Sequence, residues 1–404
     1  MTFKMLQKIS QPIRVVINLP ASKSISNRAL ILNALAYSPY EIENLAVCDD
    51  TNVMVKALDS NDTLFDVGAA GTAMRFLTAF LAKTVGEWVI TGSERMKERP
   101  IKLLVDALNQ LDGKIKYIEK EGYPPLRIYG SALTGGEIHM DGGVSSQYIS
   151  ALMMIAPYMQ KGLKIKLEGK IISLPYIKMT QKMMQDFGVK VDFKDQVIDI
   201  RPQNYQPIPY RIESDWSAAS YWYEILAVSG KGEVILKGLQ QESMQGDSQV
   251  AEIFKELGVS TEYQTDGVKL TPTGNSCTML AYNFVEQPDL VQTVAVTCCL
   301  KNIPFHFKGV QSLKIKETDR VAALIQELKK LGYVLTEPKE GELAWTGLTT
   351  DTNNNQTPII STYNDHRMAM AFAPVALIQP IKIANPEVVS KSYPGFWEDF
   401  SQLS

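Results

Sequence analysis

The stretch ASKSISNRALILNALA, residues 21–36, places Lys23 and Arg28 at the start of an apolar, helix-forming run. The first turn of a helix exposes unpaired N–H groups and carries about half a unit of positive charge, which disfavours cations. A bound anion relieves this arrangement, because backbone N–H groups, the Ser24 hydroxyl, the ammonium and the guanidinium can converge on it. Taken alone, the stretch is better explained as a capped helix with two solvated cations. The anion-binding interpretation therefore requires that similar clusters of cations and hydroxyls occur at other helix starts.

Similar clusters recur at other expected helix starts. AAGTAMR (69–75) and GSERMKERP (92–100) carry arginine, and a glycine in the first lets a ligand approach the backbone closely. GGVSSQ (142–147) and SLPY (173–176) offer neutral donors. Each cluster alone also fits capping, tight packing, turn chemistry or a solvated loop. The candidate ligands in these clusters are Gly71, Arg99, Ser145, Ser146, Gln147, Ser173 and Tyr176.

The second half of the chain supplies acids beside cations. VEQPDL (285–290) places Asp289 before an almost uncharged apolar run, and KETDR (316–320) gathers two cations and two acids. NDHRMAM (364–370) and KSYPGF (391–396) add further cations. Single clusters of this kind also arise from helix caps and i,i+4 ion pairs. The candidate residues are Asp289, Lys316, Glu317, Arg320, Arg367 and Lys391.

Together these clusters indicate one chemistry. Several cations could hold phosphate or carboxylate groups, while a few carboxylates exchange protons with the reacting atoms. Neither a G-x-x-x-x-G-K-[ST] nor a G-x-G-x-x-G motif is present, and the three histidines lack the spacing of metal ligands. The sequence therefore predicts group transfer between two anionic small molecules, with no metal and no cofactor.

Bulk composition narrows the class of protein. A chain of 404 residues is longer than one hydrophobic core usually serves, which predicts two domains. The formal net charge of −3 argues against a nucleic-acid or membrane-surface partner. Four cysteines without a C-x-x-C pair suit a reducing compartment, and the sequence shows neither a signal peptide nor an apolar run of about 18 residues. These features predict a cytoplasmic protein.

The residues that could do chemistry follow a repeated arrangement of strand, turn and helix. Six such units are expected, in two sets of three, so that two domains of similar build form with helices buried and sheets outside. Further strands are expected at 163–168 and 188–201, and a polar loop at 347–358. The six units span 13–36, 64–82, 137–159, 210–230, 313–332 and 361–377.

These motifs, taken as a set, resemble those of the 5-enolpyruvylshikimate-3-phosphate synthase family, in family order from about residue 17 to 397. The matching segments are LPASKSISNRALILNALA, GTAMR, RMKERP, GYPPL, SSQ, SMQGD, KETDR, YNDHRMAM and KSYPGF. The resemblance implies a two-domain inside-out α/β barrel, each domain with three βαβαββ repeats. One domain would comprise residues 1–19 plus 216–404 and the other residues 20–215, with the active site in a cleft between them. We expect a monomer by default.

The resemblance further implies an activity. The enzyme would transfer the enolpyruvyl group of phosphoenolpyruvate to the 5-hydroxyl of shikimate 3-phosphate, through a tetrahedral intermediate, in the shikimate pathway to chorismate. Asp289 would accept the hydroxyl proton, Glu317 would protonate the methylene carbon, and Lys23 would contact both substrates. The implied shikimate-phosphate ligands are Lys23, Ser24, Arg28, Ser145, Ser146, Gln147, Ser173, Tyr176, Asp289, Ser312 and Lys316. The implied phosphoenolpyruvate ligands are Lys23, Gly71, Arg99, Gln147, Arg320, Arg367 and Lys391.

Some positions depart from the family pattern, and two alternatives stay open. Ala69 and Ser312 stand where asparagine is usual, Phe76 replaces a common proline and Leu174 a common lysine. A sister enolpyruvyl transferase acts on UDP-N-acetylglucosamine, but its usual cysteine is missing from the loop 92–100. The other alternative is a non-catalytic relative that binds phosphometabolites; the presence of Lys23, Asp289 and Glu317 argues against it.

Overall fold

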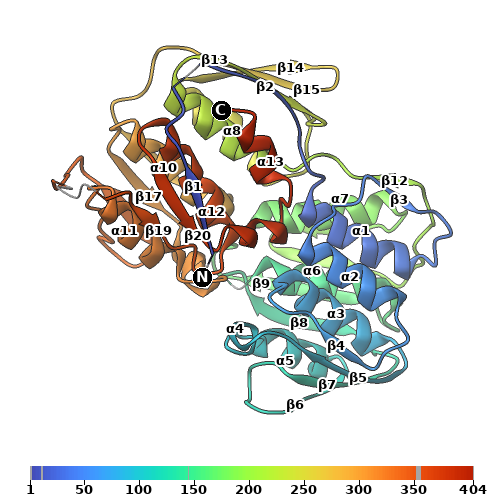
Figure 1. The fold of residues 1–404 in the computed structure, drawn as a ribbon. Helices are drawn as coiled ribbons and strands as arrows, with labels where there is room; N and C mark the ends of the chain where they lie inside the picture. The colour runs from blue at the N-terminus through green and yellow to red at the C-terminus, as the bar shows by residue number, and fades with distance from the viewer. Residues whose placement is uncertain (1, 11, 144, 352–355, 404) are drawn as a thin grey trace. The chain divides into compact units, whose positions relative to one another are not determined.

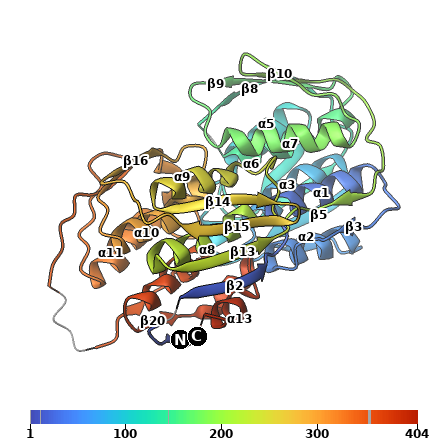
Figure 2. The same ribbon diagram turned by 90° about the horizontal axis from the view of Figure 1, so that it is seen from above.

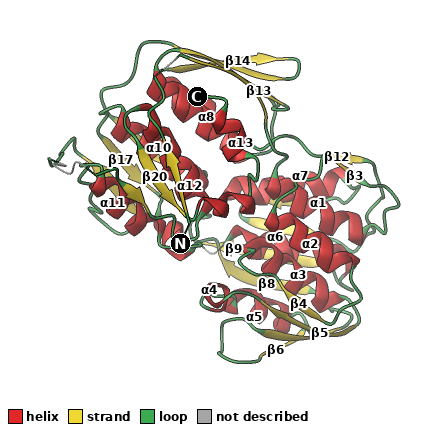
Figure 3. Cartoon of the chain, viewed as in Figure 1, coloured by secondary structure: helices red, strands yellow, loops and turns green. Residues whose placement is uncertain are grey.

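The computed structural model describes residues 2–10, 12–143, 145–351 and 356–403 (Figure 1). The chain divides into two compact units. The inserted unit is Ala21–Ile212, and the discontinuous unit consists of the residues up to Pro20 together with those from Glu213 onward. Within these described ranges each unit contains three separate sheets, and helices and strands alternate along the chain in both (Figure 3).

Two complete repeats form most of the inserted unit. In each, the first two strands are parallel and the last two pair antiparallel, in the order β4-β5-β7-β6 or β8-β9-β11-β10. The first repeat contains β4 (Leu64–Asp66), α3 (Gly71–Lys83), β5 (Gly86–Thr91), α4 (Glu94–Lys97), α5 (Lys102–Gln110), β6 (Lys114–Tyr117) and β7 (Leu126–Gly130). The second contains β8 (Gly136–Asp141), α6 (Ser146–Ile155), η1 (Ala156–Tyr158), β9 (Leu163–Glu168), α7 (Leu174–Asp186), β10 (Asp192–Lys194) and β11 (Val197–Ile200).

The third repeat of the inserted unit is shorter and joins its two ends. Strand β12, from the end of the unit, lies parallel to β3, near its beginning. Its elements are α1 (Lys23–Leu35), β3 (Ile42–Glu43), α2 (Asp49–Asp59) and β12 (Tyr210–Arg211).

The discontinuous unit uses the N-terminal segment in the same way. Strand β2 pairs in parallel with β13, so that the chain leaves this unit after the first strand of a repeat and returns at its first helix (Figure 2). The sheet order is β2-β13-β15-β14, as in the complete repeats. The elements are β2 (Ile13–Asn18), α8 (Trp216–Ser229), β13 (Gly232–Lys237), η2 (Gly246–Gln249), α9 (Val250–Glu256), β14 (Val259–Gln264) and β15 (Gly267–Pro272).

Two three-stranded sheets complete this unit. Strand β1 closes the last sheet by pairing antiparallel with β20. One repeat contains β16 (Leu280–Asn283), η3 (Pro288–Leu290), α10 (Val291–Leu300), β17 (Phe305–Lys308), η4 (Gln311–Ile315), α11 (Arg320–Lys330) and β18 (Glu342–Trp345). The last contains β19 (Ile359–Ile360), α12 (His366–Phe372), η5 (Ala373–Leu377), β20 (Ile381–Ala384), η6 (Pro386–Lys391), α13 (Phe396–Ser401) and β1 (Phe3–Leu6).

Burial explains why the helices lie inside. Every residue of α10 is buried, and so are most residues of α8, because both sequences are apolar on all faces. Strands such as β13 alternate between buried and half-buried residues, as a sheet with one outward face does. The predicted α/β class, with helices buried and sheets outside, is confirmed. Three repeats are complete in the described residues, and the other three lack one or two strands.

The expected fifth unit, 313–332, is wrong in one respect. Residues 311–315 form the 3-10 turn η4 instead of a strand. Ile315 is 57% exposed, and residues 311–315 belong to no sheet of the described structure. Helix α11 is thus the second helix of its repeat, and the first is α10. Part of the polar loop expected at 347–358, residues 352–355, lies outside the described residues.

Candidate functional site

Repetition brings the first helices of the repeats together. In the inserted unit α1, α3 and α6 pack against one another, and in the discontinuous unit α8, α10 and α12 do. α3, α6, α10 and α12 each begin after the first strand of their repeat, α1 and α8 open the parts of the chain that follow the crossings between the units, and the polar clusters of the sequence lie at or near these starts. The candidate residues therefore fall into two sets, one in each unit.

The set in the discontinuous unit is organised by Arg320, the first residue of α11. Its side chain is almost fully buried, and its guanidinium contacts three carboxylates. Nε donates to Oδ2 of Asp365 at 2.7 Å, and Nη2 donates to Oε2 of Glu317 at 2.9 Å. Nη1 donates to Oδ1 of Asp289 at 3.1 Å. Burial alone would lower the pKa of Arg320, but the charges of Asp365, Glu317 and Asp289 raise it above its ordinary value.

Two further cations complete this set. Arg367 Nη2 lies 2.9 Å from Oδ2 of Asp289, and its Nη1 donates to the Asp289 carbonyl at 3.3 Å. Lys391 Nζ donates to Oε1 of Glu317 at 2.8 Å. Each predicted acid–base residue thus lies between two cations: Asp289 between Arg320 and Arg367, Glu317 between Arg320 and Lys391. Such a site holds both carboxylates in fixed positions and keeps cations beside them.

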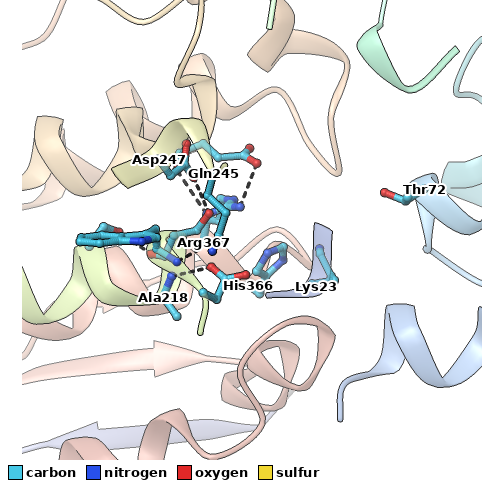
Figure 4. A network of polar contacts seen from close by, with 12 residues as sticks. Lys23, Thr72, Ala218, Gln245, Asp247, His366 and Arg367 are labelled. Atoms are coloured by element: carbon cyan, nitrogen blue, oxygen red, sulfur yellow. Dashed lines mark hydrogen bonds and ion pairs between the residues drawn. The ribbon is translucent and has the colours of Figure 1, made fainter. Parts of the chain in front are cut away.

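Asp247 is a further acid near this cluster, in addition to Asp289, Glu317 and Asp365. Its Oδ2 accepts a hydrogen bond from the Ser217 hydroxyl, while Oδ1 is buried without a hydrogen-bond partner in the described structure. Burial, together with the charge of Asp289, raises the pKa of Asp247 to about 7, although Arg367 opposes this. In Figure 4 its side chain lies near Gln245 and Arg367. Asp247 can therefore change protonation state near neutral pH.

The remaining candidates of this unit are Ser312 and Lys316. Ser312 lies half-buried in η4, and Lys316 follows directly as the residue that ends this turn. Both precede Glu317 on the segment that leads into α11.

In the inserted unit, Arg28 is buried among neutral groups. Nε donates to the Thr180 hydroxyl at 2.7 Å, Nη2 to the Ser150 hydroxyl at 3.2 Å and Nη1 to the Ser24 carbonyl at 2.9 Å. The Tyr176 ring lies 5.8 Å from the guanidinium carbon. Burial lowers the pKa of Arg28 to about 10, because neutral dipoles replace water less well than an anion would.

A second group gathers around the start of α3. A Cβ atom at Gly71 would lie 2.8 Å from Nη1 of Arg99, so the guanidinium of Arg99 lies against the Gly71 backbone. Gln147 Nε2 donates to the Thr72 hydroxyl at 3.2 Å, which joins the start of α6 to that of α3. The Ser145 hydroxyl caps α6 by accepting from the Gln147 N–H. Glycine at position 71 thus leaves room for the cation at a helix start.

The other predicted ligands of this unit lie at helix starts as well. Lys23, the first residue of α1, pairs with Asp50 of α2 at 3.0 Å. Ser146 begins α6 and is buried. Ser173 precedes α7 in the left-handed conformation, with φ at +53°. Asp50 was missed in the sequence, although it lies in the polar run CDDTN that opens α2.

Two other acids were missed as site residues. Asp365 lies inside the motif NDHRMAM, but only its pairing with Arg320 reveals its place. Asp247 ends the motif SMQGD, a signal that could have directed attention to it. Among the described residues, no group of three or more His, Cys, Asp or Glu side chains suits a metal ion, and no helix is long and apolar enough to cross a membrane.

Comparison with known proteins identifies the family. The family model described as "EPSP synthase (3-phosphoshikimate 1-carboxyvinyltransferase)" matches residues 7–60 and 56–400. The chain belongs to the EPSP synthase family. The resemblance seen in the sequence motifs is confirmed.

Members of the EPSP synthase family from several bacteria resemble the chain over almost its whole length. A 3-phosphoshikimate 1-carboxyvinyltransferase of Bacteroides fragilis is 54% identical over 390 residues, 96% of this chain and 94% of its own. The enzyme of that name from Vibrio cholerae is 38% identical, with 98% of each chain covered. A solved EPSP synthase from Acinetobacter baumannii shares the fold, with a TM-score of 0.78 at 18% identity, over 100% of this chain and 98% of its own.

Proposed function

We propose that the chain transfers the enolpyruvyl group of phosphoenolpyruvate to the 5-hydroxyl of shikimate 3-phosphate and releases phosphate. The observation that supports this most strongly is the pair of carboxylates Asp289 and Glu317 on one guanidinium, each also paired with a second cation. The relatives named 3-phosphoshikimate 1-carboxyvinyltransferase, at up to 54% identity among those compared, support the same substrates. The reaction belongs to the shikimate pathway.

The acid–base roles follow from what the reaction requires. Asp289 takes the proton of the 5-hydroxyl, and Glu317 gives a proton to the methylene carbon of phosphoenolpyruvate. The hydroxyl oxygen then bonds to the central carbon and forms a tetrahedral intermediate. In the second step the new methyl group returns one proton to Glu317 and the carbon–carbon double bond is restored, while the C–O bond to phosphate breaks and Asp289 gives its proton to the departing phosphate. Atoms and charges balance, and each carboxylate ends the cycle as it began.

Glu317 must hold a proton when it acts as an acid, although it lies between Arg320 and Lys391. Cations beside a carboxylate favour its ionised form. We infer that the anionic groups of phosphoenolpyruvate bind Arg367 and Lys391 and offset their charge. Substrate binding then raises the proton affinity of Glu317, so that the acid is prepared when the substrate arrives.

Substrate binding also involves the inserted unit in this proposal. Arg28 and Ser24, with Ser145, Ser173 and Tyr176, would bind shikimate 3-phosphate, because a phosphate supplies the anion that the neutral partners of Arg28 do not. Gly71 and Arg99 would bind phosphoenolpyruvate. The remaining members of the proposed ligand sets are Lys23, Ser146, Gln147, Ser312, Lys316, Arg320, Arg367 and Lys391. Both units, 1–19 with 216–404 and 20–215 in the proposed boundaries, are then required for turnover.

Phosphate release tests the proposal. Purified protein receives phosphoenolpyruvate with shikimate 3-phosphate, with UDP-N-acetylglucosamine, or alone, and inorganic phosphate is measured over time. Release only with shikimate 3-phosphate is expected. Release with UDP-N-acetylglucosamine would assign the sister reaction, and release with neither acceptor would leave a phosphometabolite-binding protein. We also propose a cytoplasmic monomer, which light scattering after gel filtration and cell fractionation test.

A further inference from the structure

The residues before Asp365 adopt an unfavourable backbone conformation. Tyr363 and Asn364 have φ values of +54° and +55°, and the Asp365 N–H donates to the Thr362 carbonyl at 2.8 Å. Two consecutive residues at positive φ inside a turn closed in this way are typical of type I′ turns, which favour Gly, Asn and Asp. Asparagine suits this conformation, but tyrosine does not. The surrounding structure must therefore hold Tyr363 in place.

Glu327 of α11 binds this turn and keeps Tyr363 in place. Its side chain is fully buried, and Oε1 accepts a hydrogen bond from the Tyr363 hydroxyl at 2.6 Å. Oε2 accepts from the Ser361 N–H at 3.0 Å and from Lys330 Nζ at 2.5 Å. The carboxylate thus binds the turn at two points, one before it and one within it.

The same helix also holds the other end of the turn. Arg320 lies seven residues before Glu327, on the same face of α11, and its guanidinium binds the Asp365 carboxylate. Asp365 Oδ1 in turn accepts from the Arg367 N–H at 2.9 Å, and Arg367 pairs with Asp289. A continuous series of contacts therefore leads from Glu327 through the turn to the proposed base.

We propose that Glu327 and Tyr363 are positioning residues for enolpyruvyl transfer. Their hydrogen bond fixes the turn 362–365 against α11, so that Asp365 and Arg367 stay in place around Asp289. The inference rests on the proposed function, because only that function gives Arg367 and Asp289 their roles. Neither residue needs to touch a substrate, and both act through the backbone that leads to Arg367.

Tyr363→Phe tests this role by removing only the hydroxyl. We expect a folded variant whose kcat falls about 10- to 100-fold and whose KM for phosphoenolpyruvate rises, since small displacements of a substrate-binding group have effects of this size. The KM for shikimate 3-phosphate should stay unchanged. Glu327→Gln keeps one acceptor oxygen for three donors, the Tyr363 hydroxyl, the Ser361 N–H and Lys330 Nζ, and should show the same pattern.

Two control variants separate positioning from stability. Gln326→Ala removes the exposed side chain whose Oε1 also lies 2.8 Å from the Tyr363 hydroxyl. Tyr223→Phe removes a buried hydroxyl of the same unit that bonds Thr261 at 2.8 Å. Both should keep wild-type kcat and KM values. Tyr363→Phe with wild-type kinetics would overturn the positioning role, and so would an equal kinetic loss in Tyr223→Phe.

Calorimetry keeps this test separate from the proposed function. Phosphoenolpyruvate is titrated into the wild-type chain and into Tyr363→Phe, and weaker binding to the variant is expected. If the wild-type chain releases no phosphate in the presence of both substrates, the proposed function fails. If the affinity for phosphoenolpyruvate is equal in both chains, the positioning role fails, whatever the turnover of the wild-type chain.

Discussion

Arg28 and Arg320 are equally buried but serve in opposite electrostatic environments. Arg28, in the inserted unit, donates to hydroxyls and carbonyls, and burial lowers its pKa to about 10. Arg320, in the discontinuous unit, donates to three carboxylates, whose charges raise its pKa despite burial. One arginine has its charge balanced by neutral dipoles, and the other by full negative charges.

The different surroundings of Arg28 and Arg320 suit two different tasks, although both residues stand in similar polar clusters at helix starts in the sequence. A buried guanidinium among neutral acceptors gains most from an external anion, so it suits substrate binding. A guanidinium among carboxylates instead fixes the carboxylates, so it suits the positioning of acids and bases. The inserted unit therefore provides charge for a phosphate, and the discontinuous unit provides groups that exchange protons.

The largest effect should follow from removing the proton-exchanging groups. Asp289→Asn and Glu317→Gln keep the shape of each side chain but remove its ability to take or give a proton. We expect the rate of phosphate release to fall by roughly 10²- to 10⁴-fold in each variant. Glu262→Gln, at an exposed position on β14 of the same unit, should keep the wild-type rate. A wild-type rate in both active-site variants would remove the distinction between the two units.

Replacing each arginine by methionine tests the comparison itself. Arg320→Met leaves three carboxylates without their shared cation and should lower the free energy of unfolding by about 3–5 kcal/mol. Arg28→Met leaves hydroxyls that can bond one another, as Thr180 and Ser150 already do at 2.9 Å, and should cost only about 1–2 kcal/mol. Urea unfolding followed by hydrogen exchange resolves the two units. Equal losses would mean that the carboxylates do not depend on Arg320.

The sequence predicted the helix starts that carry the candidate residues better than the partners of those residues. Helix starts such as 23–28 and 71–75 are local patterns, so serine, glycine and cation spacing was sufficient to find them. The pairing of Arg320 with Asp365 spans 45 positions in the sequence and depends on how α11 packs beside the turn before α12. Asp365 by itself fits an ordinary helix cap, a role that it also has.

In the fold, too, the local sequence predicted individual elements but not the contacts between elements distant in the sequence. Strand β2 was predicted as the strand that opens the unit 13–36, but its register with β13, which pairs Val15 with Val234, depends on the return of the chain after the inserted unit. The unit 313–332 was predicted to begin with a strand, but residues 311–315 form the turn η4. A short local stretch cannot show whether a neighbouring strand is available for pairing. Tertiary packing decides both cases.

A smaller effect, on the KM for phosphoenolpyruvate, should follow from changing the proposed anion site at Gly71 and Arg99 in the inserted unit. In Gly71→Ala the new Cβ would lie 2.8 Å from Nη1 of Arg99, so the guanidinium must move. We expect the KM for phosphoenolpyruvate to rise about 10- to 100-fold, while the free energy of unfolding changes little. Gly395→Ala is the matched control, because its Cβ would meet only Asp399, at 4.0 Å. An unchanged KM in Gly71→Ala would exclude Arg99 from binding phosphoenolpyruvate.

The last prediction concerns Asp247, the buried acid near Asp289 and Arg367 in the discontinuous unit. Burial and the charge of Asp289 raise the pKa of Asp247 from 3.8 to about 7. Between about pH 4 and pH 7 Asp247 is therefore protonated in the folded chain and ionised in the unfolded chain.

Folding is consequently disfavoured as the pH rises through this window. The unfolding free energy of the wild-type chain should fall relative to that of Asp247→Asn by about 1.4 kcal/mol per pH unit between pH 5 and pH 6.5, and level off above pH 7. Urea unfolding of both chains at several pH values measures this difference. Glu213 titrates in both chains, so its contribution cancels. If the wild-type chain instead lost stability relative to Asp247→Asn as the pH falls, Asp247 would be ionised in the folded chain and the prediction would be wrong.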